Sequence, residues 1–223
     1  MSEPRKLWIQ GPDGKLEAIL RLDREARAAV VVAHPHPQFG GTMHNSVIFH
    51  SDRELHRVGF TTLRFNFRGV EGSEGDHDGE QSGVDDLAAA VSWLRGITIG
   101  LPLYLVGFSF GAMCVLRHTL NDPMVQGVIT IGLATQRYDY NEAAALNRPF
   151  AIVQGEVDEL ADLDRVKEIA TGASPAAELH VIEGTSHLFP CLIPIIWIFG
   201  DSSQDNFFNL NRQSRANILW FRR

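Results

Sequence analysis

The stretch that decides the fold is Leu103-Tyr104-Leu105-Val106-Gly107-Phe108-Ser109-Phe110-Gly111. Its first four residues are apolar enough to form a buried strand, and residues 113–120 beyond it have a helical pattern. The chain must therefore turn sharply at Ser109, in strained backbone geometry. Gly107 and Gly111 permit this turn, because any side chain there would collide with the neighbouring strand or helix. The pattern predicts a serine hydroxyl raised above the edge of a sheet.

A serine at such a turn is well placed to attack acyl groups, because the dipole of the following helix favours developing negative charge. The pentapeptide G-F-S-F-G is a weak signal by itself, and Ser109 could instead be a helix N-cap. Its position between a strand and a helix is what the catalytic motif requires, and the sequence holds no second match. We therefore interpret Ser109 as a nucleophile.

Length and composition describe an ordinary globular chain. The 223 residues suffice for one α/β domain, and 44% hydrophobic and 21% charged residues are typical values. The net charge of −7 argues against nucleic acid or an anionic membrane as the main partner. The N-terminus has no apolar segment of the secretory type. Two cysteines, Cys114 and Cys191, make no disulfide framework, so a reducing, cytoplasmic setting is expected.

Strand-like and helix-like patterns alternate along the chain. Residues 7–22 predict a β-hairpin that turns at Asp13-Gly14. Buried strands are then expected at 29–33, 61–67, 103–106, 125–131, 149–153 and 179–182, and helices at 45–57, 84–94, 113–120 and 161–171. This alternation predicts a mostly parallel central sheet with helices on both faces.

The helix expected at 84–94 follows a glycine- and acid-rich loop over residues 69–83. Asp85 and Asp86 would fall in its first turn, where the helix dipole favours acids. The sequence thus predicts that both carboxylates stabilise the start of this helix.

A nucleophilic serine needs a base to take its proton, and the base needs an acid to orient it. On a parallel sheet these groups lie in loops at the carboxyl ends of later strands, in the order serine, acid, histidine. The strand at 149–153 leads into Gly155-Glu156-Val157-Asp158-Glu159, and Asp158, just past the turn, is the predicted acid. Glu156 is an alternative, and Asp158 could instead cap the following helix.

His187 is the predicted base, because it lies in the loop after the last recognisable strand and follows the acid in sequence. A lone histidine is more often structural, so order and loop position carry this prediction. His180 lies within the strand itself and is a weaker candidate. His118 lies on the helix after Ser109 and is expected to face away.

The transition state also needs backbone donors for the oxyanion. One is expected to be the amide of Phe110, which directly follows the nucleophile. The other should come from the loop after the strand at 29–33, where Pro35 and Pro37 have no N–H to donate. The amide of His36 is therefore the first choice for this donor and that of Gln38 the second.

The histidines of this loop invite a different interpretation. His34, His36, His44 and the run Asp76-His77-Asp78 are residue types that bind metals. Their spacing matches no zinc pattern, and neighbouring residues on an extended segment point in opposite directions. Histidines satisfied by hydrogen bonds are the better explanation, so no metal site and no cofactor are expected.

With these residues assigned, the sequence resembles the small, lid-poor bacterial proteins known as predicted α/β-superfamily hydrolases or serine esterase-like proteins. The resemblance implies an α/β-hydrolase fold with a minimal lid or none, and a triad of Ser109, Asp158 and His187. It also implies that Arg68 and Gly69 form a structural turn beside the site. The segments that carry the resemblance are H-P-H-P-Q-F-G-G-T-M at 34–43, R-F-N-F-R-G at 64–69, G-F-S-F-G at 107–111, G-E-V-D-E at 155–159 and H-L-F at 187–189.

The last part of the chain departs from this family. Leu188–Gly200 is apolar but is interrupted by Pro190 and Pro194, so it is too short and too broken to span a bilayer. Residues 201–223 are rich in Asn, Gln, Ser and Arg. The amphipathic C-terminal helix usual in the family is therefore not expected here.

The sequence thus predicts one α/β-hydrolase domain over residues 1–223, with its core at about 7–189. The predicted activity is hydrolysis of carboxylic esters through an acyl-Ser109 intermediate. Only residues 133–148 are available for a lid, which favours small, soluble acyl substrates over long lipids. A peptidase, thioesterase or acyltransferase on the same triad, or a catalytically silent binding protein, are alternatives. A homodimer is left open.

Overall fold

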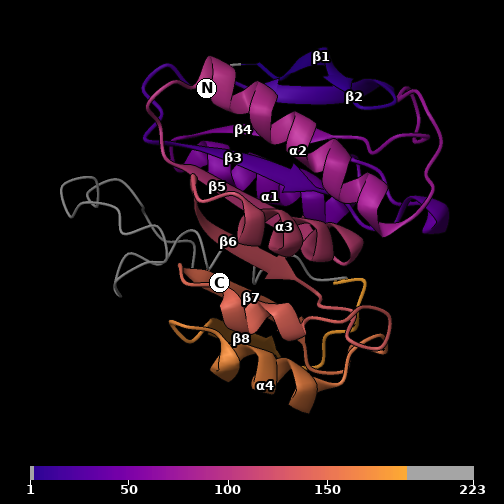
Figure 1. Cartoon of the computed structure of the whole chain (residues 1–223), viewed down its shortest axis with the longest axis vertical. Coiled ribbons are helices and arrows are strands. Elements are labelled where there is room, and N and C mark those ends of the chain that lie inside the picture. Colours follow the sequence, from indigo (N-terminus) through magenta and orange to yellow (C-terminus); the bar gives the residue numbers. More distant parts are fainter. Residues whose placement is uncertain (1–2, 190–223) are drawn as a thin grey trace, which may run out of the picture.

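In the computed structural model, residues 3–189 are described, and they form an eight-stranded sheet in the order β1-β2-β4-β3-β5-β6-β7-β8 (Figure 1). β2 pairs antiparallel with β1 and with β4, and all pairs from β4 to β8 are parallel. The strands are β1 (Arg5–Gly11), β2 (Gly14–Arg21), β3 (Ala28–Ala33), β4 (Phe60–Phe65), β5 (Leu103–Phe108), β6 (Val125–Ile131), β7 (Phe150–Gly155) and β8 (Glu178–Ile182). The expected hairpin and mostly parallel sheet are confirmed.

Helices cover both faces of the sheet, as expected. α1 packs on one face, and α2, α3 and α4 pack on the other (Figure 1). The helices are α1 (Ser46–Arg57), α2 (Glu80–Ile97), α3 (Phe110–Asn121) and α4 (Leu163–Gly172), with the short 3-10 helices η1 (Pro37–Phe39) and η2 (Asn141–Ala145). Connections from strand to helix therefore run along the carboxyl edge of the parallel strands, where loops can gather functional side chains.

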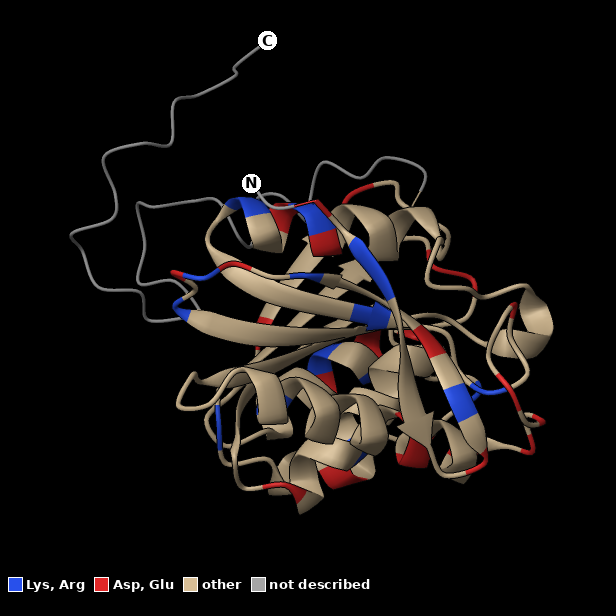
Figure 2. Cartoon of the chain, turned by 90° about the horizontal axis from the view of Figure 1, so that it is seen from above, with Lys and Arg blue, Asp and Glu red and all other residues tan. Residues whose placement is uncertain are grey.

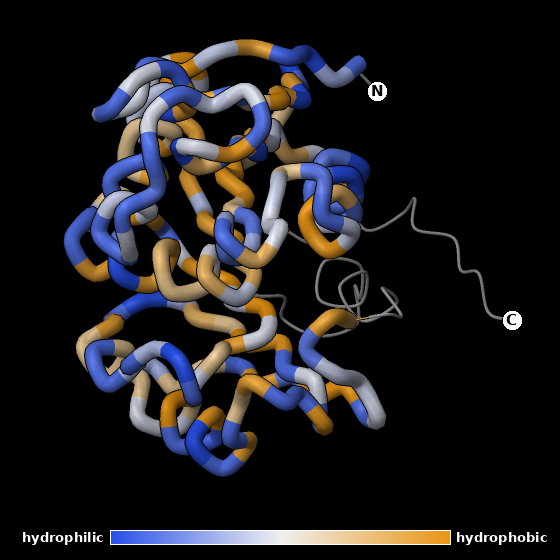
Figure 3. Tube along the Cα trace, turned by 90° about the vertical axis from the view of Figure 1, so that its right-hand side faces the viewer, coloured by the Kyte–Doolittle hydropathy of each residue, from blue (hydrophilic) through white to orange (hydrophobic). Residues whose placement is uncertain are grey.

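Strand β3 shows how the sheet is buried from both sides. Val31 and Ala33 face the core below α2 and α3, whereas Val30 and Val32 face the core below α1. All four are fully buried, so the strand is a continuous apolar run and does not alternate with polar residues. Figure 3 shows the same arrangement, with the hydrophobic colour concentrated on interior strands and the hydrophilic colour on outer segments.

Helix α2 begins at Glu80, four residues before the predicted start, so the prediction for Asp85 and Asp86 is wrong. Glu80 is the acid of the first turn, and Asp86 is buried within the helix, where it pairs with Arg68. The helix was predicted to begin too late because Gly83 is a residue typical of loops. A Cβ atom on Gly83 would lie 2.5 Å from the Phe110 ring, so the glycine lets α2 pack closely against the start of α3.

In the view of Figure 2, acidic and basic positions are interspersed along the described part of the chain. Among the described residues, none of the helices is apolar and long enough to cross a membrane. The predictions for residues 190–223, including the apolar segment and Cys191, lie outside the described residues.

Candidate active site

Ser109 lies at the sharp turn between β5 and α3, with φ 55° and ψ −112°. This left-handed backbone conformation is strained for a non-glycine residue. A Cβ atom on Gly107 would lie 2.2 Å from the Gly111 carbonyl oxygen, and one on Gly111 would lie 2.3 Å from the Ala33 oxygen. Both glycines are therefore required by the turn. The Ser109 side chain makes no capping hydrogen bond, so the alternative that it is a side-chain N-cap is wrong.

The structure brings Ser109, His187 and Asp158 together at the carboxyl edge of the sheet, and all three are buried. Nε2 of His187 lies 2.9 Å from the Ser109 Oγ, and Nδ1 of His187 lies 2.8 Å from the Asp158 Oδ2. An ionised carboxylate only accepts hydrogen bonds, so Nδ1 carries the ring proton. Nε2 is then free to accept the hydrogen of the serine hydroxyl, which is the arrangement a general base needs.

Asp158 is held by two further donors. The Gln154 side-chain amide donates to Oδ2 at 2.6 Å, and the Leu160 amide donates to Oδ1 at 2.9 Å. The Gln154 Oε1 accepts from the Leu133 amide at 2.8 Å, which fixes the orientation of the amide group. The predictions did not include Gln154. Its signal was a polar residue at the end of the otherwise apolar strand β7.

The loop that carries His187 is fixed by Glu159. The backbone N–H of His187 donates to the Glu159 Oε2 at 3.1 Å. Backbone hydrogen bonds, from Glu159 itself and from His187, lower the pKa of the Glu159 carboxyl. The His187 ring also lies beside Phe108, with 5.4 Å between ring centroids. The histidine is therefore positioned through both its backbone and its ring.

The alternative acid and base residues lie elsewhere. The Glu156 carboxylate is exposed and accepts from the Gly184 amide at 2.9 Å. His180 lies on β8 beside Glu178, and His118 lies on α3 beside Asp122. Each of these groups is paired outside the Ser109–His187–Asp158 cluster. Asp158 and His187 are thus the two predicted partners that the structure brings to Ser109.

His36 and Phe110, the predicted sources of the oxyanion donors, lie side by side, with ring centroids 4.9 Å apart. The His36 side chain caps η1 by accepting from the Gln38 amide at 3.2 Å. The Gln38 N–H is therefore already bonded to the His36 ring. This argues against Gln38, the second candidate for the oxyanion donor. Burial is the main cause that lowers the pKa of His36, followed by the charges of His77 and Arg137.

His34 connects the loop after β3 to the end of β4. Its Nδ1 donates to the Pro35 carbonyl oxygen at 2.6 Å, and its Nε2 accepts from the Phe67 amide at 3.1 Å. Complete burial lowers the pKa of His34 to about 3, so the ring is neutral. Both nitrogens of His34 are therefore used. His77 differs, because both of its ring nitrogens are buried without a hydrogen-bond partner, so the prediction that hydrogen bonds satisfy these histidines is wrong for His77. Within residues 3–189, no group of three or more His, Cys, Asp or Glu side chains is arranged to hold a metal ion.

Arg68, in the loop after β4, forms a buried ion pair with Asp86 on α2. The Asp86 carboxylate accepts from the Arg68 amide at 2.9 Å and from its guanidinium Nη2 at 2.7 Å. Burial raises the pKa of Asp86, and the hydrogen bonds from Arg68 oppose this effect. The buried pair joins the loop after β4 to α2. Arg68 therefore contacts the scaffold and not the Ser109 cluster.

Comparison with known proteins agrees with this fold. Residues 24–140 match the family described as serine aminopeptidase, S33. A protein of Rickettsia prowazekii (strain Madrid E), described only as uncharacterised, is 30% identical over 194 residues, which are 82% of each chain.

Two solved structures are similar as well. An α/β serine hydrolase without lid from Xanthomonas campestris is 31% identical, with a TM-score of 0.80 over 89% of this chain and 93% of that one. An α/β serine hydrolase homologue from Coxiella burnetii is 32% identical, with a TM-score of 0.80 over 89% and 97%. The chain therefore belongs to the serine aminopeptidase S33 family of α/β hydrolases. This confirms the resemblance and the fold class predicted from the sequence.

Proposed function

We propose that the protein hydrolyses small carboxylic esters through an acyl intermediate on Ser109. The observation that carries this proposal is the continuous hydrogen-bonded chain from the Ser109 Oγ through His187 to Asp158. Family and fold make the chain a hydrolase, and the proposal adds the ester bond and the roles of the residues.

The proposed reaction has two halves. His187 Nε2 takes the Ser109 proton as Oγ attacks the ester carbonyl, while Asp158 stabilises the imidazolium that forms. The amides of Phe110 and His36 would donate to the oxyanion of the tetrahedral intermediate. His187 then protonates the leaving alkoxide, and the acyl group remains on Ser109. In the second half, His187 takes a proton from water as the water attacks the acyl carbonyl, and it then gives that proton to the Ser109 Oγ as the acid leaves.

The proposed preference for a small acyl group depends on two features: exposed apolar side chains on the loops of the site, and a short segment between β6 and β7. Phe39, Val157 and Leu188 are 69%, 57% and 70% exposed, and each lies on a loop that carries a proposed site residue. Exposed apolar side chains gathered at one site commonly bind apolar ligand groups. The segment between β6 and β7 holds only the short η2 helix. We therefore propose an open cleft that accepts acetyl to butyryl groups better than long chains.

The experiment is hydrolysis of p-nitrophenyl esters, from acetate to laurate, by wild type and Ser109→Ala. We expect short-chain activity that falls about ten-thousand-fold in the variant, because the nucleophile is lost. Ser92→Ala is the matched control, since Ser92 is exposed on α2. Activity that survives Ser109→Ala would overturn the proposal, and a preference for laurate would overturn the small acyl group.

The triad does not by itself fix the acyl acceptor, so a peptidase on the same site is a second candidate. The description of the matched family, serine aminopeptidase, favours this candidate. Aminoacyl p-nitroanilides distinguish the two activities, because an aminopeptidase cleaves them and an esterase prefers the p-nitrophenyl esters. A folded protein that cleaves neither and resists fluorophosphonates would instead be a binding protein.

A further inference from the structure

Arg137 lies across the end of the strand that carries Ser109. It belongs to the segment after β6, and its guanidinium lies 4.9 Å from the ring centroid of Phe39, in the segment after β3. In the sheet, β5 lies between β3 and β6 and ends one residue before Ser109. The contact between Arg137 and Phe39 therefore joins the two segments that flank the nucleophile turn.

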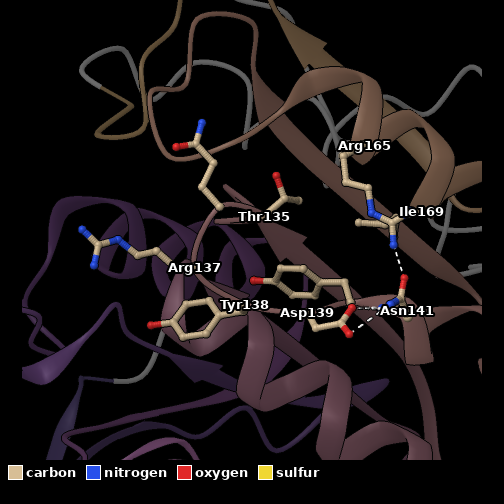
Figure 4. A pocket seen from close by; sticks show the side chains of 9 residues that line it. Thr135, Arg137, Tyr138, Asp139, Asn141, Arg165 and Ile169 are labelled. Atoms are coloured by element: carbon tan, nitrogen blue, oxygen red, sulfur yellow. Dashed lines mark hydrogen bonds between the residues drawn. The ribbon is translucent and has the colours of Figure 1, made fainter.

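The Arg137 charge has no carboxylate partner within ion-pair distance among residues 3–189. Other arginines nearby are neutralised. Arg165 pairs with Glu168 at 2.8 Å and donates to Asn141, and Arg117 pairs with Glu80 and Glu142. Figure 4 shows the Arg137 side chain extending away from Asp139, whereas the Arg165 guanidinium points to Asn141. Arg137 is thus an exposed cation that is free to bind an anion.

This cation is close enough to act on the predicted oxyanion loop. The Arg137 charge contributes to the lowered pKa of His36, after burial and the charge of His77. The opposing charge there is Glu80, which Arg117 already neutralises. Arg137 is therefore a permanent positive charge near this loop, although the whole chain carries −7.

A pocket of about 340 Å³ adjoins the cation (Figure 4). Its wall includes Arg137, Tyr138, Asp139 and Asn141, and the Asp139 carboxylate already accepts hydrogen bonds from the backbone and side-chain N–H groups of Asn141. Two contacts join its wall to segments that carry site residues: the Gln136 amide donates to the oxygen of Leu160, two residues after Asp158, at 3.1 Å, and the Tyr138 ring lies 6.2 Å from the ring of Phe110, which follows Ser109. A polar substrate group that extends from Ser109 toward Arg137 would find hydrogen-bonding side chains and a positive charge.

We propose that Arg137 binds a carboxylate of the substrate, so that the preferred substrates are esters that carry a negative charge besides the scissile bond. This inference rests on the proposed function and specifies its substrate class. Guanidinium binds a carboxylate through two parallel hydrogen bonds, which gives geometric selectivity as well as attraction. For an exposed charge pair, we expect a preference of about fivefold over a neutral ester of the same size.

The test compares matched anionic and neutral esters. Mono-p-nitrophenyl adipate against p-nitrophenyl hexanoate places the charge in the acyl half, and para-acetoxybenzoate against para-acetoxybenzamide places it in the alcohol half. For at least one of the two pairs, we expect Arg137→Gln to lower the anionic-to-neutral ratio of kcat/KM about fivefold, mostly through KM. Arg137→Lys should retain part of the ratio, and added salt should reduce it in wild type.

Arg95→Gln is the matched control, because Arg95 lies in the last turn of α2, outside the pocket, and its charge is already paired with Asp122 at 2.6 Å; it should leave the ratio unchanged. An equal loss on both members of each pair, or no loss on either, would overturn the inference and leave the esterase standing. Absence of any Ser109-dependent ester hydrolysis in wild type would instead overturn the proposed function and this inference with it. The two failures are therefore distinguishable.

Discussion

His34 and His187 are both buried at the carboxyl edge of the parallel sheet, yet their ring nitrogens have different kinds of partner. His34 follows β3, and both of its nitrogens are bonded to backbone groups. His187 follows β8, and its nitrogens contact two side chains, the Asp158 carboxylate and the Ser109 hydroxyl. The same residue type therefore fixes a loop in one region and can transfer a proton in the other.

The partners explain the difference. A backbone carbonyl and amide cannot change protonation. Burial makes the charged form of His34 unfavourable, and the hydrogen bond to the Pro35 carbonyl opposes this effect only in part. Asp158 gives His187 a compensating charge, and Ser109 gives it a proton to accept. A buried position at the carboxyl edge of the sheet is thus not enough to let a histidine transfer a proton. Four predictions test this contrast.

The largest effect is expected for His187→Gln. Without the base, kcat/KM for a short p-nitrophenyl ester should fall about ten-thousand-fold, because within residues 3–189 His187 is the side chain that is hydrogen-bonded to the Ser109 hydroxyl. The free energy of unfolding should change by less than about 1 kcal/mol, since the ring bonds only to side chains that can rearrange. Steady-state kinetics and urea unfolding check both values. A loss of stability with activity retained would reverse the contrast.

His34→Leu should act mainly on stability. The change leaves the Pro35 carbonyl and the Phe67 amide without partners in a buried region, which costs about 3 kcal/mol of unfolding free energy. Urea unfolding at neutral pH measures it. His56→Leu is a partial control, because the buried His56 ring has one backbone partner, the Phe60 oxygen, and should lose less. A loss below about 1 kcal/mol would show that His34 does not fix the loop.

The pH dependence of stability sharpens the same point. The pKa of His34 is about 3 in the folded protein, well below an ordinary histidine value, so the unfolded chain binds this proton first as the pH falls. The contribution of neutral His34 to the free energy of unfolding is therefore present above about pH 6.5 and is lost as the pH falls below that value. By pH 5 the loss from this residue is about 2 kcal/mol. Unfolding curves at several pH values, compared with His34→Leu, isolate the contribution. Parallel pH profiles for the two proteins would contradict it.

The smallest effect is expected for Gln154→Leu. Gln154 is a positioning residue, because it contacts Asp158 and the Leu133 amide and not the serine. Its loss should lower kcat about tenfold with KM unchanged, since Asp158 keeps the Leu160 amide as a donor. The split between kcat and KM for one ester decides the outcome. A change confined to KM would show that Gln154 shapes the cleft and does not orient the acid.

The fold, Ser109, Asp158 and His187 could be predicted because local patterns specify them. A tight turn flanked by glycines, and polar loops after apolar strands, are visible in a short window of sequence. The structure brings the predicted residues together, and their catalytic roles stay a prediction.

What could not be predicted depends on contacts between distant segments. The start of α2, the burial of Asp86 against Arg68, and the contact of Arg137 with Phe39 each join residues from different elements. Gly83 looked like part of a loop, because only the packing against Phe110 shows why a helix needs a glycine there.

The most direct test of the central claim is to treat the protein with a fluorophosphonate and map the adduct by mass spectrometry. The account predicts one adduct, on Ser109, formed quickly by wild type, far more slowly by His187→Gln, and not at all by Ser109→Ala. His34→Leu, kept well below its unfolding temperature, should be labelled at nearly the wild-type rate. An adduct on another residue, or a folded wild type that stays unlabelled, would contradict the claim that Ser109 is the nucleophile of a serine hydrolase.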